Sequence, residues 1–180
     1  METDVSEPRS TILVVYFSRT GTTRRIAEML AAELGADIEP ICEQGGNASR
    51  AGARGYVRSL IDALCRRRVR IMPALHDPSG YELVVMGSPV WASHASAPAL
   101  AWLAEHGAKI RHLALFCCLG GSGAKPALEQ LAGTAHQTPV ATCAITTHDV
   151  HQRIDGELRQ SFARKIRHKL ATRLEAEWGV

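Results

Sequence analysis

The chain has 180 residues, of which 46% are hydrophobic and 22% charged, a composition typical of globular proteins that excludes a fibrous or disordered chain. Its formal net charge of +3 and its pI near 8.7 fall well short of the charge of a nucleic-acid-binding domain. No apolar stretch approaches the roughly 18 residues that a membrane-spanning helix needs, so we expect a cytoplasmic protein with a single domain and no membrane partner.

Four apolar runs without polar alternation are typical of strands that are covered on both faces of a parallel sheet. They comprise residues 12–17, 83–86, 113–118 and 139–145. A weaker strand is predicted at residues 38–41, where polarity alternates and Pro40 cannot donate to a β-ladder. We therefore expect this strand at an edge of the sheet.

Helical patterns lie between these strands. After the first strand, Ile26, Leu30 and Leu34 share one helix face, and Gly35 follows as a stop signal. Similar stripes predict helices at residues 56–64, 96–106, 122–132 and about 155–178. The alternation predicts an α/β domain with a doubly wound, five-stranded parallel sheet of order 2-1-3-4-5. We expect residues 1–10 to form a flexible tail, residues 11–180 to form the domain, and residues 43–53 to form a loop.

The first strand is joined to its helix by Ser18-Arg19-Thr20-Gly21-Thr22-Thr23, which carries four hydroxyls and a glycine. In open α/β sheets, ligands bind beyond the carboxyl ends of the strands, where the strand order reverses. Hydroxyls and free amides at a helix N-terminus suit a phosphate, and Gly21 lets the backbone turn. The alternative is a threonine-rich N-cap, for which one hydroxyl would suffice. The stretch is neither a P-loop nor the three-glycine dinucleotide fingerprint.

With Tyr16-Phe17 before it and Ala27 after it, this stretch resembles the phosphate-binding signature of the flavodoxin family, aromatic-Ser-x-Thr-Gly-(Asn/Thr)-Thr. The resemblance extends from Ile12 to about Leu174. It implies a flavodoxin-like fold with FMN bound non-covalently where the strand order reverses. It also implies that the cofactor is bound by Ser18, Arg19, Thr20, Gly21, Thr22 and Thr23.

Two further loops complete the resemblance. Gly87-Ser88-Pro89-Val90-Trp91 matches the Gly-(Ser/Thr)-Pro-x-(Trp/Tyr) pattern of the family, in which this loop lines the flavin ring. Trp91 offers a flat face for stacking, the alternative being an ordinary core residue. The counterpart of the glycine-rich loop after the fourth strand binds the pyrimidine edge of the flavin. The resemblance therefore implies these additional cofactor-binding residues: Ser88, Pro89, Val90, Trp91, Cys118, Leu119, Gly120 and Gly121.

Departures from the family pattern bear on the reaction. Carrier flavodoxins are typically acidic around the flavin and enclose it between two aromatic residues, whereas this chain is basic and its third loop offers only Leu119. Ala92-Ser93-His94 stands where carriers often have a glycine or asparagine whose peptide flips to bond the reduced N5 atom of the flavin, so we do not expect strong stabilisation of the semiquinone. These departures favour an FMN-dependent oxidoreductase that passes electrons from NADH, NADPH or a protein donor to a small acceptor such as a quinone. A dedicated electron carrier between redox proteins and a flavin-free binding module of the same fold remain alternatives. We expect a monomer or homodimer whose partner is a redox protein or a small-molecule acceptor.

Other folds and chemistries fit the residues less well. A receiver domain would need an acid after the third strand, where Gly87 stands, and a low-molecular-weight phosphatase would need a cysteine at Ser18. His94 is either a proton donor near the flavin or an ordinary surface histidine. We expect no metal site, because polar capping explains the group of His148, Asp149 and His151.

The remaining candidates are cysteines and arginines. Five cysteines lack a C-x-x-C spacing and are expected to be reduced residues, mostly in the core. Adjacent residues of a strand point to opposite faces, so Cys117 and Cys118 are not expected to form a redox pair. Seven arginines lie between Arg50 and Arg70, with Asp62 as the only acid. They form either a solvated face or a patch that binds anions.

Overall fold

The computed structural model describes residues 10–44 and 69–178. Its strands are β1 (Ile12–Tyr16), β2 (Asp37–Pro40), β3 (Leu83–Trp91), β4 (His94–Ala95), β5 (Leu113–Leu119) and β6 (Ala141–Thr146). The parallel strands have the order β2-β1-β3-β5-β6, and β4 pairs antiparallel with the end of β3. The predicted order is therefore confirmed, with Pro40 in an edge strand.

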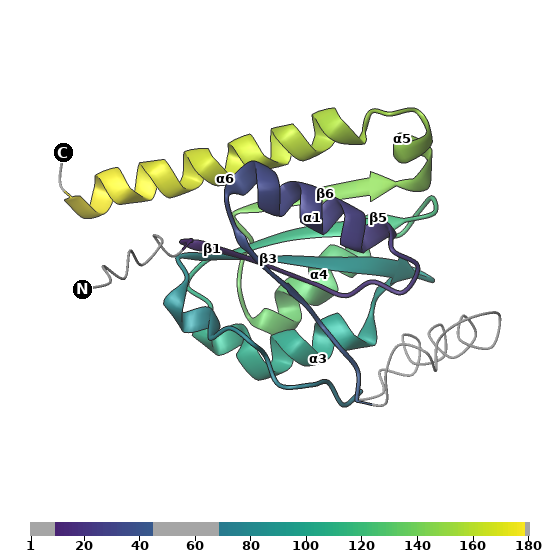
Figure 1. The fold of residues 1–180 in the computed structure, drawn as a ribbon, viewed down its shortest axis with the longest axis horizontal. Helices are drawn as coiled ribbons and strands as arrows, with labels where there is room; N and C mark the ends of the chain where they lie inside the picture. Colours follow the sequence, from purple (N-terminus) through teal and green to yellow (C-terminus); the bar gives the residue numbers. More distant parts are fainter. Residues whose placement is uncertain (1–9, 45–68, 179–180) are drawn as a thin grey trace, which may run out of the picture.

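The main helices are α1 (Thr22–Leu34), α3 (Ala97–His106), α4 (Ala124–Ala135), α5 (Thr147–His151) and α6 (Asp155–Trp178), and two short 3-10 turns are η2 (Pro78–Gly80) and η3 (Gly107–Lys109). Helices α1 and α6 cover one face of the sheet, and α3 and α4 cover the other (Figure 1). Each face has its own core, with Leu30 and Phe162 on the first and Trp102 and Leu131 on the second. The doubly wound arrangement is thus confirmed.

Strand β3 is longer than predicted. It continues through Ser88 and Pro89, which pair with Cys117 and Cys118 of β5, and it ends at Trp91. The chain then turns through Ala92 and Ser93 and returns as β4. The prediction of a loop from residue 87 was therefore wrong, because pairing with β5 holds this segment in the sheet.

A buried ion-pair network joins α6 to α1. The Nε atom of Arg159 donates to Oε1 of Glu33 at 2.6 Å, and its Nη1 atom donates to Asp155 at 3.2 Å. Arg159 and Asp155 are 8% and 7% exposed. Beside this network, Phe162 and Ile166 of the predicted apolar stripe are buried against the sheet. Helix α6 is therefore fixed to the domain by both apolar packing and charge.

Several predictions fall outside the described residues. They are most of the N-terminal tail, the helix at residues 56–64, most of the loop at residues 43–53, Cys65, and all arginines of the basic cluster except Arg70. Among the helices that the structure describes, none combines the length and the apolar character that crossing a membrane requires.

Candidate functional site

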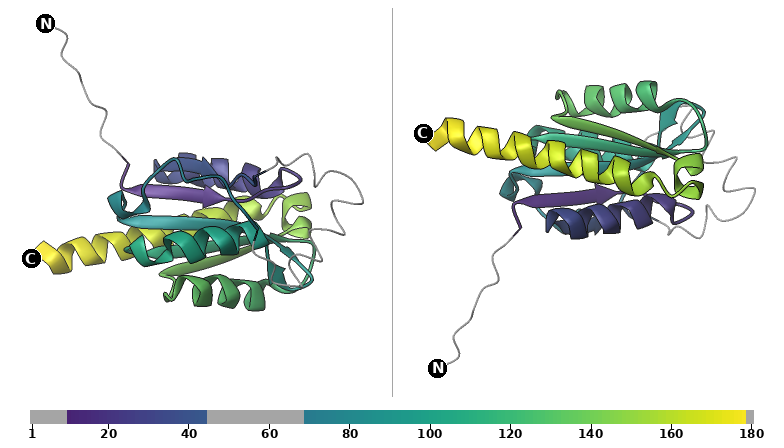
Figure 2. Two further views of the ribbon diagram at one scale, coloured as in Figure 1. Left: turned by 90° about the horizontal axis from the view of Figure 1, so that it is seen from below. Right: turned by 90° about the horizontal axis from the view of Figure 1, so that it is seen from above.

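The carboxyl ends of the parallel strands point to one end of the sheet, where the loops after β1 and β5 and the β3–β4 hairpin meet (Figure 2). They enclose a cavity of about 500 Å³, a size that is ordinary for a small-molecule site. The lining residues are Arg19, Thr20, Thr22, Thr23, Pro89, Val90, Trp91, Ala92, Ser93, Cys118, Leu119, Gly120, Gly121, Ser122 and Thr147. The structure thus brings together residues from all three predicted loops.

At one wall of the cavity, α1 begins without a side-chain cap. Its N-cap residue Gly21 has a φ of 95°, a left-handed conformation that glycine adopts without strain. Among the residues that the structure describes, no side chain accepts a hydrogen bond from the first amides, and the first turn contains no acid. The hydroxyl of Ser18 accepts the Gly21 amide at 3.1 Å and so holds the turn. The free amides and the partial positive charge of the helix N-terminus favour an anion here.

At the opposite wall, Trp91 presents an indole ring that is half buried. Phe17 contacts it edge-on, with 6.3 Å between the ring centroids. The guanidinium carbon of Arg19 lies 5.3 Å from the Trp91 ring centroid, within the range of a cation–π interaction. Arg19 therefore extends from the loop before α1 to the aromatic wall, a contact that the sequence did not reveal.

The turn at Ala92 and Ser93 is held in an uncommon conformation. Both residues have a positive φ, of 47° and 63°, although neither is a glycine. Behind the turn stands Gly123, where an added Cβ atom would lie 2.6 Å from the Cα atom of Ser93. The absence of a side chain at Gly123 thus allows the hairpin and the loop after β5 to approach closely.

The third wall consists of Leu119, Gly120 and Gly121, of which the two glycines are exposed. Below it, burial raises the pKa of the Cys118 thiol to about 12, and a hydrogen bond with Thr23 lowers it by less. Cys117 belongs to the core on the other face of the sheet. The prediction that these two cysteines point to opposite faces is therefore confirmed.

Three predicted site residues and the candidate acid do not line the cavity. Ser18 and Gly21 shape the turn before α1, as described above. Ser88 is fully buried, and its hydroxyl bonds the hydroxyl and the amide of Ser96 at 2.9 and 3.0 Å. His94 points its Nδ1 atom at the carbonyl of Ala92, at 2.6 Å. Ser88 and His94 thus support the β3–β4 hairpin in this structure.

Sequence reasoning missed four lining residues: Ala92, Ser93, Ser122 and Thr147. Thr147 follows β6, whose carboxyl end lies at the same edge of the sheet. The predicted strand order therefore already indicated that this residue lies near the site. Next to it, Asp149 and Thr146 form a capping box at the start of α5. Hydrogen bonds from the Thr146 amide and hydroxyl hold the pKa of Asp149 below its ordinary value. Asp149 therefore caps α5, as the capping interpretation predicted.

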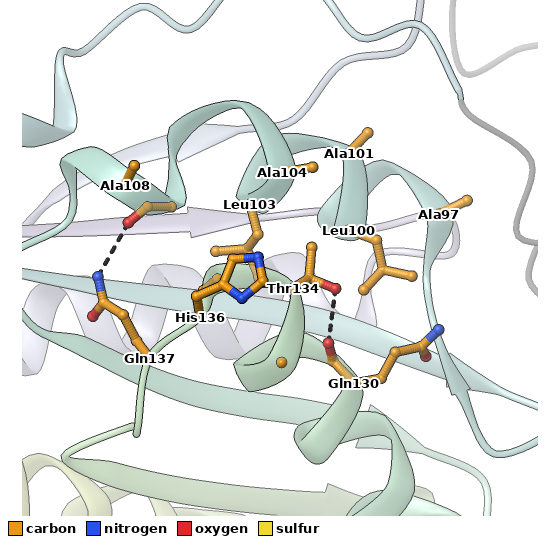
Figure 3. A pocket seen from close by; sticks show the side chains of 13 residues that line it. Ala97, Leu100, Ala101, Leu103, Ala104, Ala108, Gln130, Thr134, His136 and Gln137 are labelled. Atoms are coloured by element: carbon orange, nitrogen blue, oxygen red, sulfur yellow. Dashed lines mark hydrogen bonds between the residues drawn. The ribbon is translucent and has the colours of Figure 1, made fainter.

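A larger groove of about 820 Å³ runs between α3 and α4. Leu100, Leu103 and several alanines line it (Figure 3), and the side chains of Gln130, Thr134 and Gln137 already form hydrogen bonds with the backbone. Gln137 donates to the carbonyls of Gly107 and Ile110, and Gln130 accepts the Ala95 amide. Within residues 10–44 and 69–178, no Asp, Glu, Lys or Arg and none of the motif residues line this groove, so the smaller cavity is the better candidate for the chemistry.

The cavity has the features that a planar ligand with a phosphate requires. An uncapped helix N-terminus with the Thr20 and Thr22 hydroxyls stands at one wall, and an aromatic ring stands at another. Two exposed glycines leave room beside them. These donors and this shape fit FMN.

The chain was compared with family models, with curated proteins and with solved structures. A family model described as flavodoxin matches residues 11–152. No curated protein matches the chain in sequence.

Solved structures with the same fold include a flavoprotein in complex with FMN from Lactobacillus acidophilus, at 19% identity and a TM-score of 0.65 over 79% of this chain and 97% of that chain. A flavoprotein described as putative from Bacteroides eggerthii is 24% identical, with a TM-score of 0.66 over 86% of this chain and 99% of that one. The apo form of an NADH:FMN oxidoreductase is 11% identical, with a TM-score of 0.52 over 88% of each chain. At these identities the likenesses establish the fold.

Proposed function

The chain belongs to the flavodoxin family, and from this premise we propose that it is an FMN-dependent oxidoreductase that transfers electrons from a reduced nicotinamide or a protein donor to a small acceptor such as a quinone. One observation carries the proposal. The uncapped N-terminus of α1 and the ring of Trp91 line the same cavity at the strand ends. An anion-binding helix start and an aromatic wall are what the phosphate and the ring of FMN require.

Different residues would hold the phosphate and the ring of the cofactor. Thr20, Thr22 and the first amides of α1 would hold the phosphate, while Trp91 and the Leu119–Gly121 wall would enclose the ring. FMN, when bound, supplies the redox chemistry. For a quinone the overall reaction is NAD(P)H + H⁺ + quinone → NAD(P)⁺ + hydroquinone, in which one hydride and one proton from solvent are consumed. The protein's part is to bind, to orient and to exclude water.

An enzyme is favoured over a dedicated carrier by the third wall of the cavity. Exposed glycines and Leu119 stand there, and no second aromatic residue lines the described cavity. Such a wall leaves space for an acceptor beside the flavin. The FMN complex of the Lactobacillus acidophilus flavoprotein supports the choice of cofactor.

The phosphate assignment is tested with the Thr20→Ala/Thr22→Ala double variant and with Thr138→Ala/Thr172→Ala as a control at exposed sites outside the cavity. Hydrogen bonds to a charged group contribute roughly 1.5–3 kcal/mol each, so we expect at least a tenfold loss of FMN affinity in the first variant. Riboflavin lacks the phosphate and should bind both variants alike. Quenching of flavin fluorescence measures all four affinities. Undiminished FMN affinity in the first variant would remove the basis of the proposal.

The choice between enzyme and carrier needs a separate experiment. The FMN-loaded protein is titrated anaerobically with NADH and with NADPH, and then illuminated. Rapid bleaching of the flavin by either nucleotide is the expected result. No reaction with either nucleotide, followed by slow photoreduction in one-electron steps, would exclude a nicotinamide donor and favour a carrier.

A further inference from the structure

We propose that the chain forms a two-fold symmetric homodimer through a surface beside the end of α3, and that Leu75 of each copy enters a hollow on the other. This surface, the Leu75 patch, consists of residues that surround one hollow, Pro73, Leu75, Asp77, Glu105 and Lys109, and of the neighbouring Met72. The inference goes beyond the proposed function, since the hollow and the cavity at the strand ends share no lining residue within the described part of the chain.

The first observation is a pair of exposed apolar side chains. Leu75 is 80% exposed and Met72 is 51% exposed, more than any other large apolar side chain that the structure describes. The segment that carries them runs past α3 before β3 begins (Figure 1). Apolar residues that gather on one surface segment indicate a protein interface, whereas residues scattered singly do not.

A buried carboxylate holds Leu75 in this position. Glu39 of β2 is 3% exposed, and its two oxygens accept the backbone amides of Leu75 and His76 at 3.0 and 2.9 Å. The second oxygen also lies 2.9 Å from Nδ1 of the His76 ring. Because these contacts fix the backbone, a partner that covers the leucine orders little that is not already ordered. Leu75 is therefore preorganised for contact with another protein surface.

Beside Leu75 lies a hollow of about 530 Å³, which the same segment forms together with Glu105, His106 and Lys109. It is larger than a leucine side chain, so the patch carries both a projecting side chain and a space that receives one. In a two-fold dimer the same surface of both copies meets, and such a surface must therefore complement itself. The Leu75 patch meets this requirement, whereas an unrelated partner would need only one of the two features.

The charges around the hollow are also self-complementary. Lys109 is exposed, and within residues 10–44 and 69–178 it forms no ion pair. The Glu105 side chain is 59% exposed and approaches only His106, at 3.9 Å. Asp77, in contrast, already accepts the amide and the hydroxyl of Ser79 at 3.2 and 2.8 Å. We therefore assign Lys109 of one copy to Glu105 of the other, a contact that the symmetry makes twice.

The leucine contact is tested by sedimentation equilibrium of the full chain, which measures the dissociation constant of the dimer. We expect Leu75→Ser to raise this constant roughly a hundredfold, because each dimer loses two leucine contacts. Ile154→Ser is the matched control and should leave the constant unchanged, since Ile154 is 42% exposed and lies outside the patch. A wild type that is still monomeric at roughly 0.1 mM, or a dimer that Leu75→Ser leaves intact, would overturn the inference. The FMN-saturated and the FMN-free chain are both measured, so the result does not depend on the proposed function.

The two charges test whether the partner is a second copy. Lys109→Glu and Glu105→Lys each place like charges opposite one another twice, so each variant alone should dimerise more weakly than the wild type. Mixed in equal amounts, the two variants should form a heterodimer, because both contacts then join opposite charges again. Light scattering measures the mass in each sample. Single variants that dimerise like the wild type, or a mixture that dimerises no better than its components, would overturn the arrangement.

Discussion

Gly87 gives the sharpest test of how the sheet is packed. It lies in β3 directly beside Phe116 of β5, and a Cβ atom added at Gly87 would lie 2.5 Å from Cε1 and 2.9 Å from Cε2 of the Phe116 ring, and closer still to Cζ. Phe116 is fully buried in the core beneath α1 and α6. The ring would have to move by about an ångström into a closely packed core.

Overpacking of this kind costs roughly 1–3 kcal/mol, and the lower chain entropy of unfolded alanine offsets about 0.4–1 kcal/mol. We therefore expect Gly87→Ala to lower the free energy of unfolding by about 2 kcal/mol. At this chain length that corresponds to a fall in Tm of roughly 4–8 °C. Urea unfolding followed by circular dichroism measures the change.

A matched control is available in α4. Gly133 is exposed, and a Cβ atom there would meet nothing within 4 Å, so Gly133→Ala should stabilise the protein by up to about 1 kcal/mol. The same Gly→Ala substitution is thus expected to lower the free energy of unfolding at Gly87 and to raise it at Gly133. Replacing Phe116 by leucine should also make Gly87→Ala less costly by more than about 1 kcal/mol. An unchanged stability of Gly87→Ala, or no coupling to Phe116, would refute the packing described here.

Two further predictions concern charged groups. Arg159→Met leaves the carboxylates of Glu33 and Asp155 without their cation and should lower the free energy of unfolding in urea by about 3 kcal/mol, because breaking a buried ion pair is expensive. The control Arg111→Met, at the exposed pair with Glu82, should lower it by less than about 1 kcal/mol. Equal losses in the two variants would contradict the difference in burial. Burial lowers the pKa of His106, so as the pH falls the unfolded chain binds a proton at this histidine before the folded protein does. The wild type should therefore lose stability relative to His106→Phe as the pH falls through about 6.5, the ordinary pKa of histidine. A constant difference between pH 8 and pH 5 would show that His106 is not desolvated.

The order of the sheet was predictable because its signals are local. Each buried strand reads as an uninterrupted apolar run, and Pro40 excludes β2 from the interior of the sheet. The extension of β3 was not predictable in this way. Its turn uses Ala92 and Ser93, which are not typical of a tight hairpin turn, and its stability depends on pairing with β5 and on the close approach of Gly123.

For the Gly87-Ser88-Pro89 motif, the structure gives a different reason for the glycine from the one that the family resemblance suggests. The resemblance associates the segment with the flavin ring, yet Gly87 is required by the ring of Phe116, and Ser88 is occupied with Ser96. Only Pro89 among these three lines the cavity. Motif residues that support the sheet cannot be separated from ligand-binding ones until the neighbouring strand is known.

The two halves of the site therefore differ in how they depend on the chain. The half that we propose binds the phosphate needs only the turn before α1, whose donors come from consecutive residues and from the helix itself. The half that we propose binds the ring needs three segments that are far apart in sequence and that contribute Arg19, Trp91 and Gly120 to the same cavity. Arg19 belongs to the first segment by sequence and to the ring half by its contact with Trp91, so the two halves are linked through one residue of the turn before α1.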